Sequence, residues 1–151
     1  MSISKLTVLC SAVLAIGLAA FAAEEKAKEF KQICPVSGGP AKEDKTAEYK
    51  GAKVYFCCEN CPKAFAKDTA KFAVKANQQL VSTGQATQGK CPLSGGKLNP
   101  DATVEVGKVK VSFCCDNCKG KVAAAKGDEQ AALVFSDDAF AKGFEVKKAA
   151  K

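Results

Sequence analysis

The residues best suited to chemistry in this chain are its cysteines, eight of which form two sets of four with identical spacing. In each set, a Cys-Pro-x-Ser-Gly-Gly turn lies 22 residues before a Phe-Cys-Cys-x-Asn-Cys cluster, and the whole pattern returns after 57 residues. The first set is Cys34, Cys57, Cys58 and Cys61, and the second is Cys91, Cys114, Cys115 and Cys118. Thiols repeated in this way can bind a soft metal ion, exchange disulfides or cross-link a small fold.

Metal binding is the interpretation that the spacing favours. Cys57 and Cys61 lie across a predicted strand end and helix start, which places two sulfurs within one ligand sphere with bonds of about 2.3 Å, and Cys34 can reach them from its turn. A helix N-terminus favours the anion, so we expect Cys58 and Cys61 to ionise readily. Adjacent cysteines make strained disulfides with each other.

Two other interpretations stay open. An oxidising compartment would turn the eight cysteines into structural disulfides, for example between Cys34 and Cys61. The Cys58-x-x-Cys61 spacing also matches that of thiol-exchange proteins, although no thioredoxin-like pattern of strands and helices follows it.

Composition sets limits on the site and its partners. The 151 residues are 47% hydrophobic and 26% charged, as in globular proteins. Histidine is absent from the sequence, which excludes imidazole ligands and Cys-His or Ser-His catalysis. The net charge of +7 comes from scattered lysines with no arginine, so we expect no nucleic-acid partner. Units of about 57 residues bury little core and commonly depend on metal or disulfides.

The sequence predicts how each copy positions its cysteines. In the first copy we expect a β-hairpin over Thr46–Cys57 around Lys50-Gly51, and in the second one over Thr103–Cys114 around Gly107. The glycine is displaced by one position between the copies, so the two turns need not be identical. Each cluster then begins a helix, with Asn60 and Asn117 expected as N-caps.

Further helices complete each copy. We expect a break at Asp68-Thr69 and a second helix to Leu80 in the first copy, a break at Gly127-Asp128 with a helix to Phe135 in the second, and a short closing helix over residues 137–142. The fold class is therefore α+β, built as two tandem modules over residues 23–81 and 90–151. The polar segment 82–89 is predicted to be a short hinge.

Residues 1–22 have the pattern of a secretory signal peptide. Lys5 precedes an apolar run that ends in the small-residue pattern Ala20-Phe21-Ala22, with acidic residues directly after it. The alternative is a retained membrane anchor, which needs nearly 20 apolar residues. We expect cleavage before Ala23, loss of Cys10, no membrane span in the mature chain, and a periplasmic or extracellular location.

At these motifs the chain resembles the YHS and TRASH domains. The residues that carry the resemblance are Cys34-Pro35-Val36-Ser37-Gly38, Tyr49 to Cys57, Cys61, Phe65 and Lys71-Phe72, and it covers nearly the whole mature chain twice. Those domains are small treble-clef modules of bacterial and archaeal copper and heavy-metal handling proteins. The resemblance implies a treble-clef-like fold and metal ligands at Cys34, Cys57 and Cys61, and at Cys91, Cys114 and Cys118. It also implies an envelope metal-transport or metal-sensing protein as partner.

One departure from the four-cysteine sites of related domains leaves the metal undecided. Ser37 and Ser94 stand where those sites have a second turn cysteine. The fourth ligand is then Cys58 or Cys115, a water molecule, or nothing. Strand alternation would place Cys58 beside Val54 and Phe56 as a buried, uncoordinated thiol, which favours a three-thiolate site suited to Cu(I).

The sequence therefore predicts an exported binding protein, not an enzyme, with about one zinc or copper ion per module. The alternatives are a thiol-disulfide redox protein and a disulfide-stapled interaction module.

Overall fold

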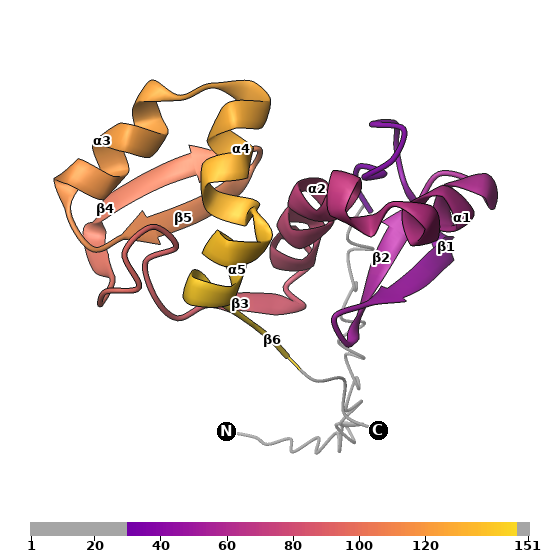
Figure 1. Ribbon diagram of the computed structural model, residues 1–151, viewed down its shortest axis with the longest axis horizontal. Coiled ribbons are helices and arrows are strands. Elements are labelled where there is room, and N and C mark those ends of the chain that lie inside the picture. The colour runs from indigo at the N-terminus through magenta and orange to yellow at the C-terminus, as the bar shows by residue number, and fades with distance from the viewer. Residues whose placement is uncertain (1–29, 148–151) are drawn as a thin grey trace, which may run out of the picture.

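The computed structural model describes residues 30–147 and contains helices and small antiparallel sheets in two similar halves (Figure 1). The predicted signal peptide lies outside the described residues. The first half has β1 Lys42–Tyr49, β2 Ala52–Phe56, α1 Asn60–Lys67 and α2 Thr69–Ser82. The second has β4 Asn99–Val106, β5 Val109–Phe113, α3 Asp116–Ala124, α4 Gly127–Phe135 and α5 Asp137–Gly143. Two short strands, β3 Ala86–Gln88 and β6 Phe144–Val146, pair with each other. The mixed α and β composition is confirmed, whereas the treble-clef assignment stays a prediction.

The two hairpins, β1–β2 and β4–β5, have the same register and the same turn. In each hairpin the register of the first strand shifts before the regular pairing begins. The shift lies between Lys42 and Thr46 in one hairpin and between Asn99 and Thr103 in the other. The two turn residues have positive φ in both copies, at 52° and 80° for Lys50-Gly51 and at 53° and 69° for Gly107-Lys108. Such turns match the twist of a hairpin. Moving the glycine by one position therefore leaves the turn unchanged, because one lysine in each copy accepts the left-handed conformation.

Both predicted helix breaks are present, the second at Ala125-Lys126 and not at Gly127-Asp128, but the predicted N-caps are wrong. Asp68 separates α1 from α2 and accepts a hydrogen bond from the Lys71 backbone amide at 3.2 Å. Helix α1 begins at Asn60 itself, with Glu59 in the cap position, and α3 begins at Asp116, with Cys115 in the cap position. Neither cap makes a side-chain hydrogen bond, so the clusters enter their helices without the expected asparagine cap.

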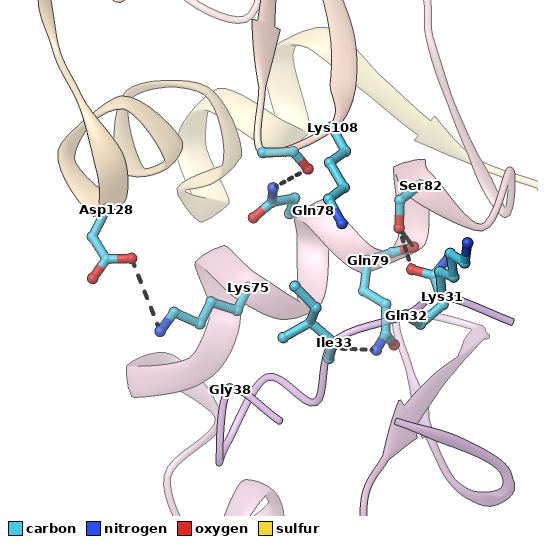
Figure 2. Close-up of a pocket in the computed structure, with 11 residues that line it drawn as sticks. Lys31, Gln32, Ile33, Gly38, Lys75, Gln78, Gln79, Ser82, Lys108 and Asp128 are labelled. Atoms are coloured by element: carbon cyan, nitrogen blue, oxygen red, sulfur yellow. Dashed lines mark hydrogen bonds and ion pairs between the residues drawn. The ribbon is translucent and has the colours of Figure 1, made fainter. Parts of the chain in front are cut away.

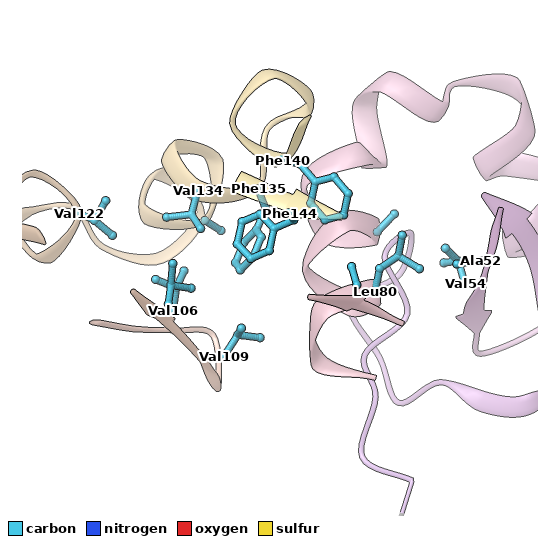
Figure 3. Packing of buried hydrophobic residues seen from close by; sticks show 14 of the residues in the cluster. Ala52, Val54, Leu80, Val106, Val109, Val122, Val134, Phe135, Phe140 and Phe144 are labelled. Atoms are coloured by element: carbon cyan, nitrogen blue, oxygen red, sulfur yellow. The ribbon is translucent and has the colours of Figure 1, made fainter. Parts of the chain in front are cut away.

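Helix α2 lies between the halves, and one hydrophobic core extends through both (Figures 1 and 3). Leu80 of α2 is fully buried in the same cluster as Phe135 and Phe140 of the second half. The amide of Asn77, also fully buried, donates to the Phe135 carbonyl at 2.9 Å. Gln78 donates to the Gly107 carbonyl at 3.0 Å. These contacts fix the two halves against each other.

The segment 82–89 is not the simple hinge that its polar composition predicts. Residues 86–88 form β3, whose partner is β6 at the end of the described chain. Ala86 is buried, and Gly89 and Lys90 both donate to the Gly143 carbonyl, at 2.9 and 3.1 Å. Pairing with a strand more than 50 residues away cannot be read from local composition, and it anchors the connection.

Glutamine side chains cover the open edge of each hairpin, at β2 in the first half and at β5 in the second. Gln79 accepts from the Tyr55 amide at 2.7 Å and donates to the Tyr55 and Ile33 carbonyls, each at 2.9 Å. Gln88 accepts from the Ser112 amide at 2.9 Å and donates to its carbonyl at 2.6 Å. Because an unpaired edge leaves backbone groups without partners, these amides act in place of a third strand.

Within residues 30–147, every helix is too short or too polar to cross a membrane.

Candidate metal centres

Each turn cysteine is held by a compact backbone loop that is the same in the two copies. The Cys34 amide donates to the Gly39 carbonyl at 2.8 Å, and the Gly38 amide donates back to the Cys34 carbonyl at 2.9 Å. The same two bonds in the second copy, between Cys91 and the glycines that follow it, measure 2.9 and 2.7 Å. Gly38 and Gly95 both have φ of 72°, which side chains disfavour.

The turn serine contacts the cluster directly. Ser37 Oγ accepts from the Gly39 amide at 3.2 Å and lies 3.2 Å from Cys57 Sγ. Ser94 Oγ makes the matching contacts, at 3.2 Å to the Gly96 amide and 3.1 Å to Cys114 Sγ. From the sequence, these serines were interpreted only as replacements for a second turn cysteine. Their side chains instead hold the turn beside the second ligand of each predicted site.

The structure brings together the three cysteines predicted as ligands in each copy. The sulfurs of Cys34, Cys57 and Cys61 all lie within 4.8 Å of one another, as do those of Cys91, Cys114 and Cys118. Cys57 Sγ is 3.5 Å from Cys61 Sγ, and Cys114 Sγ is 3.7 Å from Cys118 Sγ. Sulfurs bound to one zinc ion in a tetrahedron lie about 3.8 Å apart. Two cysteine triads could therefore each hold a metal ion.

The triads lie at the edge of the core. Cys34 and Cys91 are fully buried and Cys61 is 7% exposed, while Cys57, Cys114 and Cys118 are half-buried. Phe56 and Phe113, the residues just before each cluster, are fully buried. The apolar side of each triad is closed by the core, and its other side faces solvent.

The predicted burial of Cys58 is wrong. Strand β2 ends at Phe56, so the alternation of faces does not extend to Cys58, which is exposed. Cys115 is exposed as well. Cys58 Sγ lies 3.4 Å from Cys61 Sγ, and Cys115 Sγ lies 3.6 Å from Cys114 Sγ. Each is thus an accessible thiol beside a triad, and neither belongs to the group of mutually close sulfurs.

The thiols of each set differ in acidity. Burial opposes ionisation of Cys34, but hydrogen bonds from the Ser37 side chain and from the Ser37, Cys57 and Val36 backbone outweigh it and lower its pKa to about 7. Burial likewise opposes ionisation of Cys91, and hydrogen bonds from Ser94 and nearby backbone lower its pKa to about 6. The turn therefore stabilises a thiolate in each metal-free triad.

The helix cysteines differ from the expectation of easy ionisation. Burial, followed by hydrogen bonds with neighbouring thiols, raises the pKa of Cys61, and the same causes raise the pKa of Cys118 to about 12. A hydrogen bond from the Cys61 side chain lowers the pKa of Cys58, and a backbone hydrogen bond at Cys118 lowers that of Cys115. The prediction of a lowered pKa is correct for Cys58 and wrong for Cys61, where burial dominates.

A separate cleft of about 410 Å³ lies between the halves (Figure 2). Ile33, Lys75, Gln78 and Lys108 contribute to its lining, and Lys75 Nζ lies 3.9 Å from an Asp128 carboxylate oxygen. Among the described residues, no cysteine lines it. The triads therefore do not depend on this cleft.

Comparison with known proteins identifies no family. No protein-family model, curated protein or solved structure matches the chain. The function of the chain must therefore be inferred from the geometry of its cysteines.

Proposed function

We propose that each copy binds one soft or borderline metal ion, zinc or copper(I), through three thiolates. The observation that carries the proposal is the convergence of three sulfurs within 4.8 Å in both copies, from a turn, a strand end and a helix start. Thiolate is the ligand that zinc and copper(I) accept most readily, and three thiolates suit hard ions poorly. The chain is an exported metal-binding protein of YHS/TRASH-like type that acts in heavy-metal handling.

The test is metal analysis with thiol counting on anaerobically purified protein. We expect two ions per chain, one of which is lost in Cys34→Ser and the other in Cys91→Ser. Lys97→Ser, an exposed change near the second turn, is the control and should keep two ions. Four disulfides and no metal in the anaerobic protein would contradict the proposal.

Thiol-disulfide exchange is the second candidate, and one observation favours it. Cys58 is exposed with a lowered pKa, whereas Cys61 is buried with a raised pKa and lies 3.4 Å away. An accessible, acidic thiol beside a second one is what dithiol exchange requires. Reduction of an insulin disulfide that depends on Cys58 would support this candidate. Metal binding accounts for all three converging sulfurs, whereas exchange uses two.

A further inference from the structure

The exposed cysteines Cys58 and Cys115 have no place in the three-thiolate sites, yet the fold holds each beside one. Cys58 Sγ is 3.4 Å from the sulfur of Cys61, a residue that is 7% exposed. An ion bound to the triad would thus have a solvent-facing sulfur next to one of its own ligands.

The second copy repeats the arrangement. Cys115 is also exposed, and its Sγ lies 3.6 Å from Cys114 Sγ. Cys58 interacts with both Cys57 and Cys61, and Cys115 interacts with both Cys114 and Cys118. The two copies therefore agree on an accessible thiol at the edge of the triad and outside its group of mutually close sulfurs.

We propose that Cys58 and Cys115 are transfer thiols, through which each metal ion passes between its triad and a thiolate ligand of an acceptor molecule. This inference rests on the proposed function, because it needs a loaded triad. It adds the chemical class of the partner, a thiol-bearing metal acceptor or donor. It also separates the eight cysteines into six that hold metal and two that move it.

The exchange step conserves atoms and charge. In the first copy, Cys58 Sγ forms a bond to the ion while the bond between the ion and Cys61 Sγ breaks, and the proton that Cys58 loses is taken by Cys61. An acceptor thiol then bonds to the ion at the surface and gives its proton to the next triad sulfur that is released. In the second copy, Cys115 displaces Cys114 in the same way. The step requires no oxidant, because sulfur and metal keep their oxidation states.

A transfer thiol affects the rates of metal binding and release without setting the affinity for the metal. The proposal can therefore be tested in the full chain. The probe is cadmium(II), whose thiolate bonds absorb in the near ultraviolet, and the acceptor is glutathione. Cys58→Ser should slow binding and release tenfold or more for half of the bound ions, and Cys115→Ser should do so for the other half. The dissociation constant should stay within threefold in both variants, because both rates fall together. Asn60→Ser, at the exposed residue that begins α1, is the matched control and should leave the rates unchanged.

Each other outcome overturns the inference. If Cys58→Ser weakens binding tenfold or more, Cys58 is a resident fourth ligand. If it changes neither rates nor affinity, Cys58 is a bystander. If the unmodified chain binds no cadmium, the proposed function fails first, and the transfer role fails with it. The number of ions bound, measured before the kinetics, distinguishes this last case from the other two.

Discussion

At the residue scale, the two kinds of cysteine should react differently with an alkylating reagent. Cys58 and Cys115 are exposed with lowered pKa, whereas Cys34 and Cys91 are fully buried. Alkylation needs both the thiolate and access to it. In metal-free protein, iodoacetamide should therefore modify Cys58 and Cys115 first, as measured by peptide mass spectrometry.

Metal loading should increase the difference in alkylation rate between the two kinds of cysteine. The triad cysteines become protected, while Cys58 and Cys115 continue to react, because they lie outside the proposed ligand set. Protection of Cys58 and Cys115 to the same degree as the triads would contradict a three-thiolate site. Denatured protein, in which all the cysteines react, gives the reference rates.

The sequence predicted which cysteines lie close together better than it predicted their surroundings. The spacing and the repeat predict that Cys34, Cys57 and Cys61 lie in a turn, at a strand end and at a helix start. Those three elements bring the sulfurs together. The burial of Cys58 was wrong because the alternation rule holds only inside a strand, and β2 ends at Phe56. The acidity of Cys61 was wrong because burial, which a sequence does not reveal, outweighs the helix end.

At the element scale, Gln79 is the side chain that joins the cysteine turn to its hairpin. The residue is 4% exposed, and its side-chain amide is hydrogen-bonded to Tyr55 in β2 and to Ile33, the residue before Cys34. Replacing it with leucine leaves these backbone groups without their partner, at about 1–3 kcal/mol for a buried group. We expect Gln79→Leu to lower the free energy of unfolding by about 2–3 kcal/mol and to weaken metal binding in the first copy only.

Urea unfolding and metal titration measure the two effects. Thr87→Leu, an exposed change in β3, is the control for added apolar surface and should have little effect on either. Unchanged metal binding in Gln79→Leu would show that the turn is positioned without this amide.

Element types and breaks were predictable, but the edge contacts were not. Alternating apolar residues and turn glycines identified both hairpins, and Asp68 and Gly127 marked the helix breaks. The roles of Gln79 and Gln88 depend on which helix or strand lies beside each sheet edge. That arrangement is tertiary, and nothing in the local pattern of these glutamines distinguishes them from exposed ones.

At the scale of the whole molecule, Asp137 contributes a pH-dependent contact between the halves. Its Oδ1 accepts from Lys50 Nζ at 2.7 Å, Asn77 Nδ2 at 3.1 Å and Tyr49 Oη at 3.2 Å. The Lys50 hydrogen bond is the main cause that lowers the pKa of Asp137. Because the folded-state pKa is below the unfolded value of 3.8, the contribution is fully present above that pH and is lost as the pH falls through the folded value.

We therefore expect Asp137→Asn to cost about 0.5–1 kcal/mol of unfolding free energy at neutral pH, since the pair is partly exposed. The cost should decrease as the pH falls below 3.8 and disappear once the pH is below the lowered pKa of Asp137, where the carboxylate of the unmodified chain is protonated. Urea unfolding across this range measures it, with Asp138→Asn as the control for charge. A cost that is the same at both ends of the range would mean that the contact does not depend on the Asp137 charge.

The shared core is what the sequence did not predict. Two copies joined by a polar segment indicate two separate modules, yet the buried Leu80 of the first half belongs to one core cluster with residues of the second, and the buried Asn77 donates to the Phe135 carbonyl. The apolar face of α2 is compatible with packing on its own hairpin or on another unit, and only the fold decides between them. A core that extends through both halves predicts cooperative unfolding.

Loading the first triad should therefore stabilise the second half as well. In the Cys91→Ser chain only the first site can bind, and zinc at 100 times its dissociation constant stabilises a folded state by about 2.7 kcal/mol. If the halves unfold together, that increment applies to every amide that exchanges by global unfolding, including those of α4 and α5. We expect slower hydrogen exchange in residues 127–143 on zinc addition, together with a single calorimetric transition that moves to higher temperature. Slower exchange confined to residues 30–82, with a second transition that does not move, would mean that the contacts of α2 do not couple the halves.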